Sequence, residues 1–276
     1  MRRQRSLTSQ AHRAHRTVSA LSQRYAATLT SLNRMPWPAR IPSGSLLLII
    51  DALWFKFHEK RWTAYLMAVR SANGDDAVFL RPVLCKEWES AEGWSRCIGG
   101  IPRGIRSRIL ALVSDSIRGI EGIAADHGWV LQRCHFHLMS RLHVFLGSIK
   151  RRIRWRSGRR RAYQTVKQII ATNDPVITRR LAARIRGYIA HPLCPKPYRY
   201  RLGEVLRRLD EYRSYLVHPD LNLPSTTNVM ESMNSRIREF LGRARGYRTP
   251  EALERWLLMF VRLHPTMKCR KKNLQN

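Results

Sequence analysis

The pattern of apolar and polar positions divides the chain into a strand-rich first half and a helical remainder. Residues 46–57 form an almost continuous apolar run, which is typical of a buried strand. Segments 62–69 and 77–84, the latter broken by Pro82, predict two more strands, and polar turns separate the three. Short connections between consecutive strands indicate an antiparallel meander. Helical spacing is then expected over 86–98.

A second group of apolar segments follows near the middle of the chain. Residues 105–113 predict a fourth strand that ends beside Asp115, 117–127 predict a helix, and 130–134 predict a short fifth strand. Strands that alternate with helices indicate the α/β class. We therefore expect a mixed five-stranded sheet flanked by helices.

The rest of the pattern is helical. Residues 138 to about 219 show helical spacing throughout, and further helices are predicted from about Asn228 to Leu241 and over 250–263. Residues 17–32 also have helical spacing. A basic arm with one short helix explains this N-terminal segment more simply than a remnant of a helix-turn-helix, because no second helix is recognisable there.

Charge changes this picture most. The chain has 51 Lys and Arg against 19 Asp and Glu, a net charge of +32, and the basic residues are spread over its whole length. Such repulsion destabilises a compact fold unless a polyanion neutralises it. Because arginine suits bidentate phosphate contacts, nucleic acid is the expected partner, and a membrane surface or an acidic substrate is the alternative. The predicted DNA-binding arginines are Arg151, Arg152, Arg154, Arg159, Arg160, Arg236, Arg238, Arg243 and Arg245.

Cysteine usage and hydropathy indicate the compartment. The five scattered cysteines do not form a disulfide framework, so a reducing compartment is expected. The basic N-terminus lacks the apolar segment of a signal peptide, and residues 46–53 are too short to span a bilayer. We expect a cytoplasmic, nucleoid-associated protein without a membrane partner.

Two acidic residues follow apolar strands. Asp51 and Asp115 would meet at one edge of the sheet if their strands were parallel neighbours. A divalent cation relieves the repulsion of two adjacent carboxylates, and hard oxygen ligands select Mg²⁺ or Mn²⁺. Two such ions about 4 Å apart assist an in-line phosphodiester displacement. The alternative is that both residues are turn residues or ion-pair partners of arginine, and spacing alone favours neither.

Glu231 is the third candidate acid. Asn228 followed by Glu231 fits a helix N-cap with an acid at the third position, which is a purely structural role. Glu231 nevertheless lies off the apolar stripe of its helix, on a face shared with Asn234 and Arg238. That face could serve both a metal and a phosphate, and capping is compatible with ligation.

Cys134-x-x-His137 resembles half of a zinc site. A structural zinc needs four ligands, usually in two separated pairs, and no second pair is present. A packing or hydrogen-bonding role is therefore favoured. Glu204, Asp210 and Glu211 stand among arginines at helical spacing and indicate ion pairs on a solvated face.

Three segments together resemble the Mutator-like superfamily of DDE transposases found in bacterial insertion sequences. They are LLLIIDALWFKF (46–57), ALVSDSIRGIEGIAADHGWVLQRCHFHL (111–138) and STTNVMESMNSRIREFLGRARGYRTPEALERWL (225–257). The resemblance covers about residues 45–265 and implies a ribonuclease-H-like core with an all-helical insertion. It implies that Asp51, Asp115 and Glu231 are catalytic acids and metal ligands. Supporting positions that match the family signature are Cys134, His137, Asn228 and Asn234.

The resemblance also implies an activity and a domain plan. The enzyme would use two Mg²⁺ (or Mn²⁺) ions to cleave DNA and transfer the strand of an insertion sequence, acting as a homodimer or higher oligomer on double-stranded DNA (transposon ends and target). One ion would activate water and the other would stabilise the leaving 3′ oxygen. The expected parts are an N-terminal arm (1–44), two core segments (45–137 and 225–265), an insertion (138–224) and a basic tail (266–276).

Two other functions stay open. Family members usually have a longer N-terminal DNA-binding region, so this chain could be a truncated or domesticated transposase that binds DNA without catalysis, as a regulator. Ser116 also replaces the glycine that is common after the second acid. A nuclease of the same fold without strand transfer is the third possibility.

Overall fold

A computed structural model describes residues 7–15, 17–37, 40–147, 154–244 and 249–269. The fold is mixed α/β, as the pattern predicts, and its described residues include seven strands and many helices. The chain forms two compact units. Unit 1 comprises Met1–Arg108 and Asn228–Asn276, and unit 2 comprises Ile109–Thr227.

Among the described residues, five strands belong to unit 1. Strand β1 (Leu46–Phe57) pairs antiparallel with β2 (Lys60–Ser71) along the whole length of both. β2 also pairs with β3 (Asp76–Phe79) and β4 (Val83–Cys85). β3 pairs in turn with β7 (Thr266–Lys268), so residues from both ends of the sequence share one antiparallel arrangement. The predicted meander of the first strands is confirmed.

A two-residue turn closes the β1–β2 hairpin. His58 and Glu59 have φ values of 46° and 63°, in the left-handed region. Two-residue hairpin turns favour positive φ values because their twist then matches the twist of the two paired strands. The left-handed conformation costs a non-glycine residue about 1–2 kcal/mol. The register that follows places Trp54 opposite Thr63 and Lys56 opposite Arg61.

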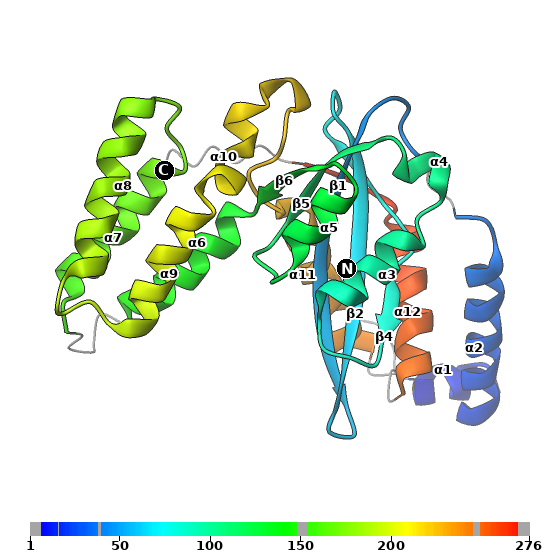
Figure 1. Ribbon diagram of the computed structural model, residues 1–276. Coiled ribbons are helices and arrows are strands. Elements are labelled where there is room, and N and C mark those ends of the chain that lie inside the picture. The colour runs from blue at the N-terminus through cyan, green and yellow to red at the C-terminus, as the bar shows by residue number, and fades with distance from the viewer. Residues whose placement is uncertain (1–6, 16, 38–39, 148–153, 245–248, 270–276) are drawn as a thin grey trace. The chain divides into compact units, whose positions relative to one another are not determined.

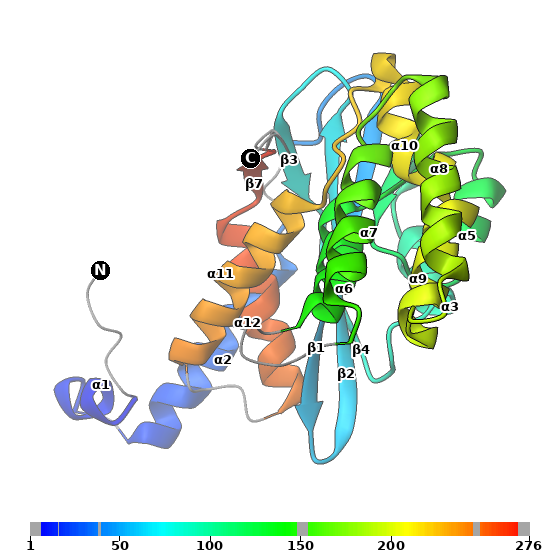
Figure 2. The same ribbon diagram turned by 90° about the vertical axis from the view of Figure 1, so that its left-hand side faces the viewer.

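Helices cover unit 1. They are α1 (Leu7–Arg13), α2 (Val18–Arg34), α3 (Ala91–Gly99), α4 (Arg103–Arg106), α11 (Asn228–Ala244) and α12 (Pro250–Leu263). Figures 1 and 2 show α2 beside α12. Asn33 Nδ2 donates to the Arg255 carbonyl at 3.1 Å, and Arg262 donates to the carbonyls of Met35 and Pro36. The N-terminal segment is therefore packed on the unit and contains two helices, where the sequence predicts a solvated arm with one.

The core of unit 1 lies along β1. Residues 46–50 are fully buried, because a continuous apolar strand must be covered on both faces. Met230, Met233 and Ile237 on α11 are also fully buried, and this helix packs against β1. The apolar stripe of α11 thereby fixes which of its residues come close to the strand.

Unit 2 begins with a parallel pair of strands. β5 (Ile109–Ser114) and β6 (Val130–Arg133) align in parallel with Leu112 opposite Leu131, and α5 (Ile120–Asp126) connects them. A helical group follows, visible in green and yellow in Figure 1. It consists of α6 (His135–His143), η1 (Val144–Leu146), α7 (Arg156–Ile169), α8 (Pro175–Ala190), α9 (Lys196–Arg207), α10 (Leu209–Val217) and η2 (Pro219–Leu221). Its core includes Leu142, Val166, Ile185 and Leu202.

The number of strands differs from the five predicted. The segment 77–84 is interrupted before Pro82, because proline cannot donate to a ladder, and β3 and β4 result. β7 lies within the predicted tail, where three residues are too few to show a pattern. The helix expected from residue 86 begins only at Ala91, because the Ser90 hydroxyl accepts from Gly93 N at 3.0 Å and caps it. The strand expected from residue 105 begins at Ile109, after α4.

The boundaries of the two units also differ from the predicted domain plan. β5, α5 and β6 group with the helices after residue 138 rather than with β1 and β2. Side chains of α10 and β6 explain this: Ser214 Oγ donates to the Leu131 carbonyl at 2.6 Å, and Gln132 Nε2 donates to the Tyr212 carbonyl at 3.1 Å. Within unit 2, α10 is therefore joined to β6 by side-chain hydrogen bonds, and the domain plan stays a prediction.

Candidate metal centre

Asp51 is held in place from two directions. Its Oδ1 accepts from Ala52 N at 2.9 Å, and its Oδ2 accepts from Asn234 Nδ2 at 2.7 Å. Asp51 lies within β1, which spans the predicted range 46–57, at the point where complete burial gives way to partial burial. The carboxylate orientation is thus set by α11, a helix far along the chain.

Glu231 lies on the same face of α11 as Asn234. Residues three apart in a helix share a face, and here Asn234 is buried while Glu231 is half-buried. One carboxylate oxygen of Asp51 and one of Glu231 lie within 4.8 Å of each other. This separation is comparable with two metal–oxygen bonds of about 2.0–2.6 Å each. The pair in unit 1 could therefore hold a divalent ion.

The surrounding oxygen atoms fit a hard cation. Asn234 donates its amide nitrogen to Asp51, which leaves its Oδ1 buried and without a hydrogen-bond partner among the described residues. A buried acceptor without a donor costs about 1–3 kcal/mol. Carboxylate and amide oxygens are the ligands that Mg²⁺ and Mn²⁺ prefer. The donor set is thus compatible with either metal.

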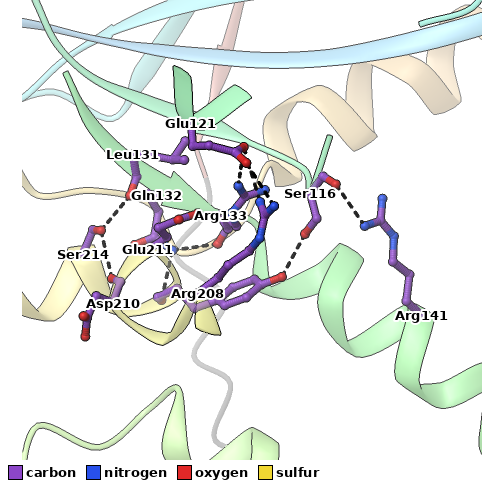
Figure 3. Close-up of polar contacts among 11 residues, drawn as sticks. Ser116, Glu121, Leu131, Gln132, Arg133, Arg141, Arg208, Asp210, Glu211 and Ser214 are labelled. Carbon is purple, nitrogen blue, oxygen red and sulfur yellow. Dashed lines mark hydrogen bonds and ion pairs between the residues drawn. The ribbon is translucent and has the colours of Figure 1, made fainter. Parts of the chain in front are cut away.

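Asp115 lies in unit 2, directly after β5. Its side chain is 15% exposed, and Oδ2 accepts from Arg141 Nη2 at 2.9 Å. Arg141 also approaches the Ser116 carbonyl, as Figure 3 shows. The other carboxylate oxygen, Oδ1, is buried without a hydrogen-bond partner among the described residues. Asp115 therefore forms an ion pair, as one interpretation of the sequence expects, and still has an oxygen available for a ligand.

Cys134 has a hydrogen-bonding environment in unit 2. It is fully buried immediately before α6, and its Sγ accepts from the amide and the hydroxyl of Thr227, both at 3.3 Å. This geometry joins the start of α6 to the segment before α11. His137 is half-buried on α6, and Asn228 is the first residue of α11 rather than the residue before it.

His135 is a buried residue whose importance the sequence does not reveal. Its Nε2 lies 2.6 Å from the Tyr212 carbonyl oxygen, and the ring is fully buried. Burial lowers the pKa of this imidazole to about 4, and the Tyr212 carbonyl opposes the shift. The ring is therefore neutral near pH 7 and donates one hydrogen bond to α10. A histidine at a variable position inside the CxxH pattern carries no signal for this role.

The predicted DNA-binding arginines fall into three groups. Arg154 and Arg160 in unit 2 and Arg236 and Arg238 on α11 are exposed. Arg159 is different, because its Nη1 donates to the Phe145 carbonyl at 2.9 Å and its own carbonyl accepts from Tyr198. Arg151, Arg152 and Arg245 lie outside the described residues, as does the side chain of Arg243.

A buried charge network joins β6, α5, α10 and Arg208, the residue between α9 and α10 (Figure 3). The Arg133 side chain is fully buried and forms ion pairs with Glu121, at 3.0 Å, and with Glu211. Arg208 Nη2 lies 3.0 Å from the other oxygen of Glu121. The prediction that Glu211 forms an ion pair on a solvated face is wrong about its surroundings, because its partner is buried. Glu204 does pair with a neighbouring arginine, Arg201, at 2.9 Å.

No helix within the described part of the chain is both long and apolar enough to cross a membrane. Comparison of the chain with models of known protein families finds no match, and comparison with curated proteins finds none either.

Proposed function

We propose that the protein is a DDE transposase that cleaves DNA and transfers strands in a divalent-metal-dependent reaction. The observation that carries this proposal is the proximity of Asp51 and Glu231, whose carboxylate oxygens lie within 4.8 Å of each other although β1 and α11 are far apart in the sequence. The net charge of +32 and the resemblance of three segments to Mutator-like transposases support it. We also propose that the α/β fold is of the ribonuclease-H type.

The ligand set is part of the proposal. Asp51 and Glu231 would hold the metal from unit 1, and we propose, from the resemblance to Mutator-like transposases, that Asp115 is the third acid of a set that holds two Mg²⁺ ions. When bound, such ions activate water and stabilise the leaving 3′ oxygen in an in-line displacement. Asp115 Oδ1, buried without a hydrogen-bond partner among the described residues, is consistent with this role.

Other residues would position the substrate and the ligands. Asn234 fixes the orientation of Asp51 through its 2.7 Å hydrogen bond, as outer-shell partners commonly do for metal-binding carboxylates. Exposed arginines such as Arg236 and Arg238 would bind DNA phosphates near the carboxylates of the same helix. The substrates would be transposon ends and target DNA, bound by a dimer or a higher oligomer in the nucleoid.

A strand-transfer assay tests the function. The substrate is the DNA that flanks the reading frame of this protein. It is incubated with the wild-type chain in two parallel reactions, one containing MgCl₂ and the other EDTA. We expect cleaved ends and joined products only with Mg²⁺, and none with Asp51→Asn, Asp115→Asn or Glu231→Gln. Asn234→Ala should lower metal affinity or activity by about 10–100-fold. Glu239→Gln, the same charge change on the exposed face of α11, should leave both unchanged.

Titration with Mn²⁺ by calorimetry provides a second readout that is independent of the DNA sequence. Loss of Mn²⁺ binding in Asp51→Asn and Glu231→Gln, with retention in Glu239→Gln, is the expected result. Tight DNA binding without cleavage by the wild type would instead identify a DNA-binding regulator. Cleavage without joining would identify a nuclease.

A further inference from the structure

Two exposed tryptophans of unit 1 enclose an arginine. Trp54 is 60% exposed and Trp88 is 69% exposed, although tryptophan is usually largely buried. The guanidinium of Arg61 lies 3.6 Å from the ring centroid of Trp88 and 4.5 Å from that of Trp54. The three side chains form a planar cation between two indole rings, and we call them the Trp–Arg–Trp group.

The fold holds this group firmly. Trp54 and Arg61 are on the paired strands of the β1–β2 hairpin, whose register is continuous to the turn. Trp88 is on the segment between β4 and α3, and the neighbouring Glu87 anchors that segment. Thr63 Oγ1 donates to the Glu87 carbonyl, and the Tyr65 hydroxyl donates to Glu87 Oε1, both at 2.7 Å. These hydrogen bonds fix the segment that carries Trp88 against β2.

A pocket of about 230 Å³ opens beside these rings. Its walls include the Trp–Arg–Trp group together with Ala52, Leu53, Thr63 and Glu89, whose Oε1 accepts from Trp94 Nε1 at 3.0 Å. It is smaller than the pockets of about 300–1,000 Å³ that enclose drug-sized molecules, so it fits a single small ring system. A flat aromatic ligand could stack on an indole there.

We propose that the Trp–Arg–Trp group binds an unpaired nucleobase of single-stranded nucleic acid. Indole rings stack on any base, and each such contact contributes about 1–3 kcal/mol to binding. Arg61 disfavours a cationic ligand in the adjoining pocket, because it repels a second positive charge, and it can contact the phosphate of a nucleotide whose base stacks on a free indole face. The basic surface of the whole chain favours the same partner.

This inference rests on the proposal that nucleic acid is the partner, but not on catalysis. Successive strand residues point to opposite faces, so Trp54 lies on the opposite face of β1 from Asp51. Changes to the tryptophans therefore leave the carboxylates untouched. Binding measured in EDTA excludes cleavage from the readout.

The experiment is fluorescence anisotropy with a labelled 20-nucleotide thymidine strand and with a 20-base-pair duplex, in EDTA at one fixed salt concentration. We expect the double variant Trp54→Ala/Trp88→Ala to weaken single-strand binding at least about tenfold, and duplex binding by less than about twofold. Tyr200→Ala is the matched control. Tyr200 is 61% exposed on α9, with Arg201 and Arg207 5.7 and 5.8 Å from its ring, and its loss should change neither affinity.

A single strand without bases tests base stacking with the wild-type chain. This test does not depend on whether the tryptophan variants fold. Removing the bases keeps the phosphates, so it should weaken binding by a factor similar to that of the double variant. Equal losses for single strand and duplex would overturn the inference, as would unchanged single-strand affinity or an abasic strand that binds as well as the normal one. If the wild type binds these DNAs but never cleaves its flanking DNA, the proposed activity fails while the base site stands.

Discussion

At the scale of single residues, the two compact units hold polar groups in environments that their sequence neighbours do not predict. Asn234 is buried and aims its amide nitrogen at Asp51, and His135 is buried with a hydrogen bond to Tyr212. Helical spacing indicates that Glu231 and Asn234 share a face, but it does not say what that face meets. Long-range packing makes that choice.

The buried imidazole of His135 predicts a pH dependence of stability. Its pKa is about 4 in the folded chain and near 6.5 when unfolded, so the unfolded chain binds more protons between these values. The contribution of the neutral His135 ring to stability is therefore fully present above about pH 6.5, and it is lost as the pH falls towards 4. His135→Gln keeps a donor for the Tyr212 carbonyl but cannot titrate. We expect the free energy of unfolding of the wild type, relative to this variant, to fall by about 2 kcal/mol between pH 7.5 and 5.

Urea unfolding at several pH values measures this difference. His12→Gln, at an exposed position of α1, is the control and should show the same pH dependence as the wild type. Parallel curves for wild type and His135→Gln would show that His135 does not titrate in this range.

At the scale of elements, the sequence predicts long segments well and short ones poorly. β1 and the helices α11 and α12 correspond to strong patterns, because burial repeats over many residues there. β4 and β7 are three residues each, and only their pairing partners define them. Charged residues that join elements are also hard to predict, since an arginine on a short strand such as Arg133 gives no sign of burial.

The Arg133 network should contribute to the stability of unit 2. In Glu121→Gln/Glu211→Gln the buried guanidinium loses both carboxylates, and we expect a loss of about 2–3 kcal/mol in the free energy of unfolding. Arg133→Met removes the buried charge and leaves its partners Glu121 and Glu211 41% and 30% exposed, with Glu121 still paired with Arg208. It should therefore cost less, about 1 kcal/mol.

Chemical denaturation of each variant gives these values. Glu59→Gln, whose partner Lys56 is exposed at the hairpin turn, controls for the loss of a carboxylate and should be close to neutral. A larger loss for Arg133→Met than for the double variant would show that desolvation of Arg133 is not the dominant cost.

At the scale of the whole molecule, the net charge of +32 is expected to determine how strongly DNA affinity depends on salt concentration. A protein that contacts 6–10 phosphates loses about 10³–10⁵ in duplex affinity between 50 and 200 mM salt. We expect such a loss here, measured by anisotropy with a 20-base-pair duplex. Arg236→Gln/Arg238→Gln should lower the slope of log affinity against log salt by about 2, since each lost phosphate contact lowers it by about 0.9.

Arg103→Gln is the control for this measurement, because Arg103 is exposed but outside the predicted binding set. It should leave the slope nearly unchanged. A slope that the α11 double variant does not alter would remove these two arginines from the DNA-binding surface.

The amino-acid sequence by itself determined the α/β class, the long strands and helices, and the high positive charge that favours binding to a polyanion. These properties depend only on local periodicity and composition. The tertiary structure alone decided which polar groups meet. It brought Asn234 to Asp51 across 183 residues and set Glu231 within 4.8 Å of the same aspartate. It also enclosed Arg61 between two exposed tryptophans. The physical reason is that spacing along the chain fixes the face on which a side chain stands, while packing of distant elements fixes what that face contacts.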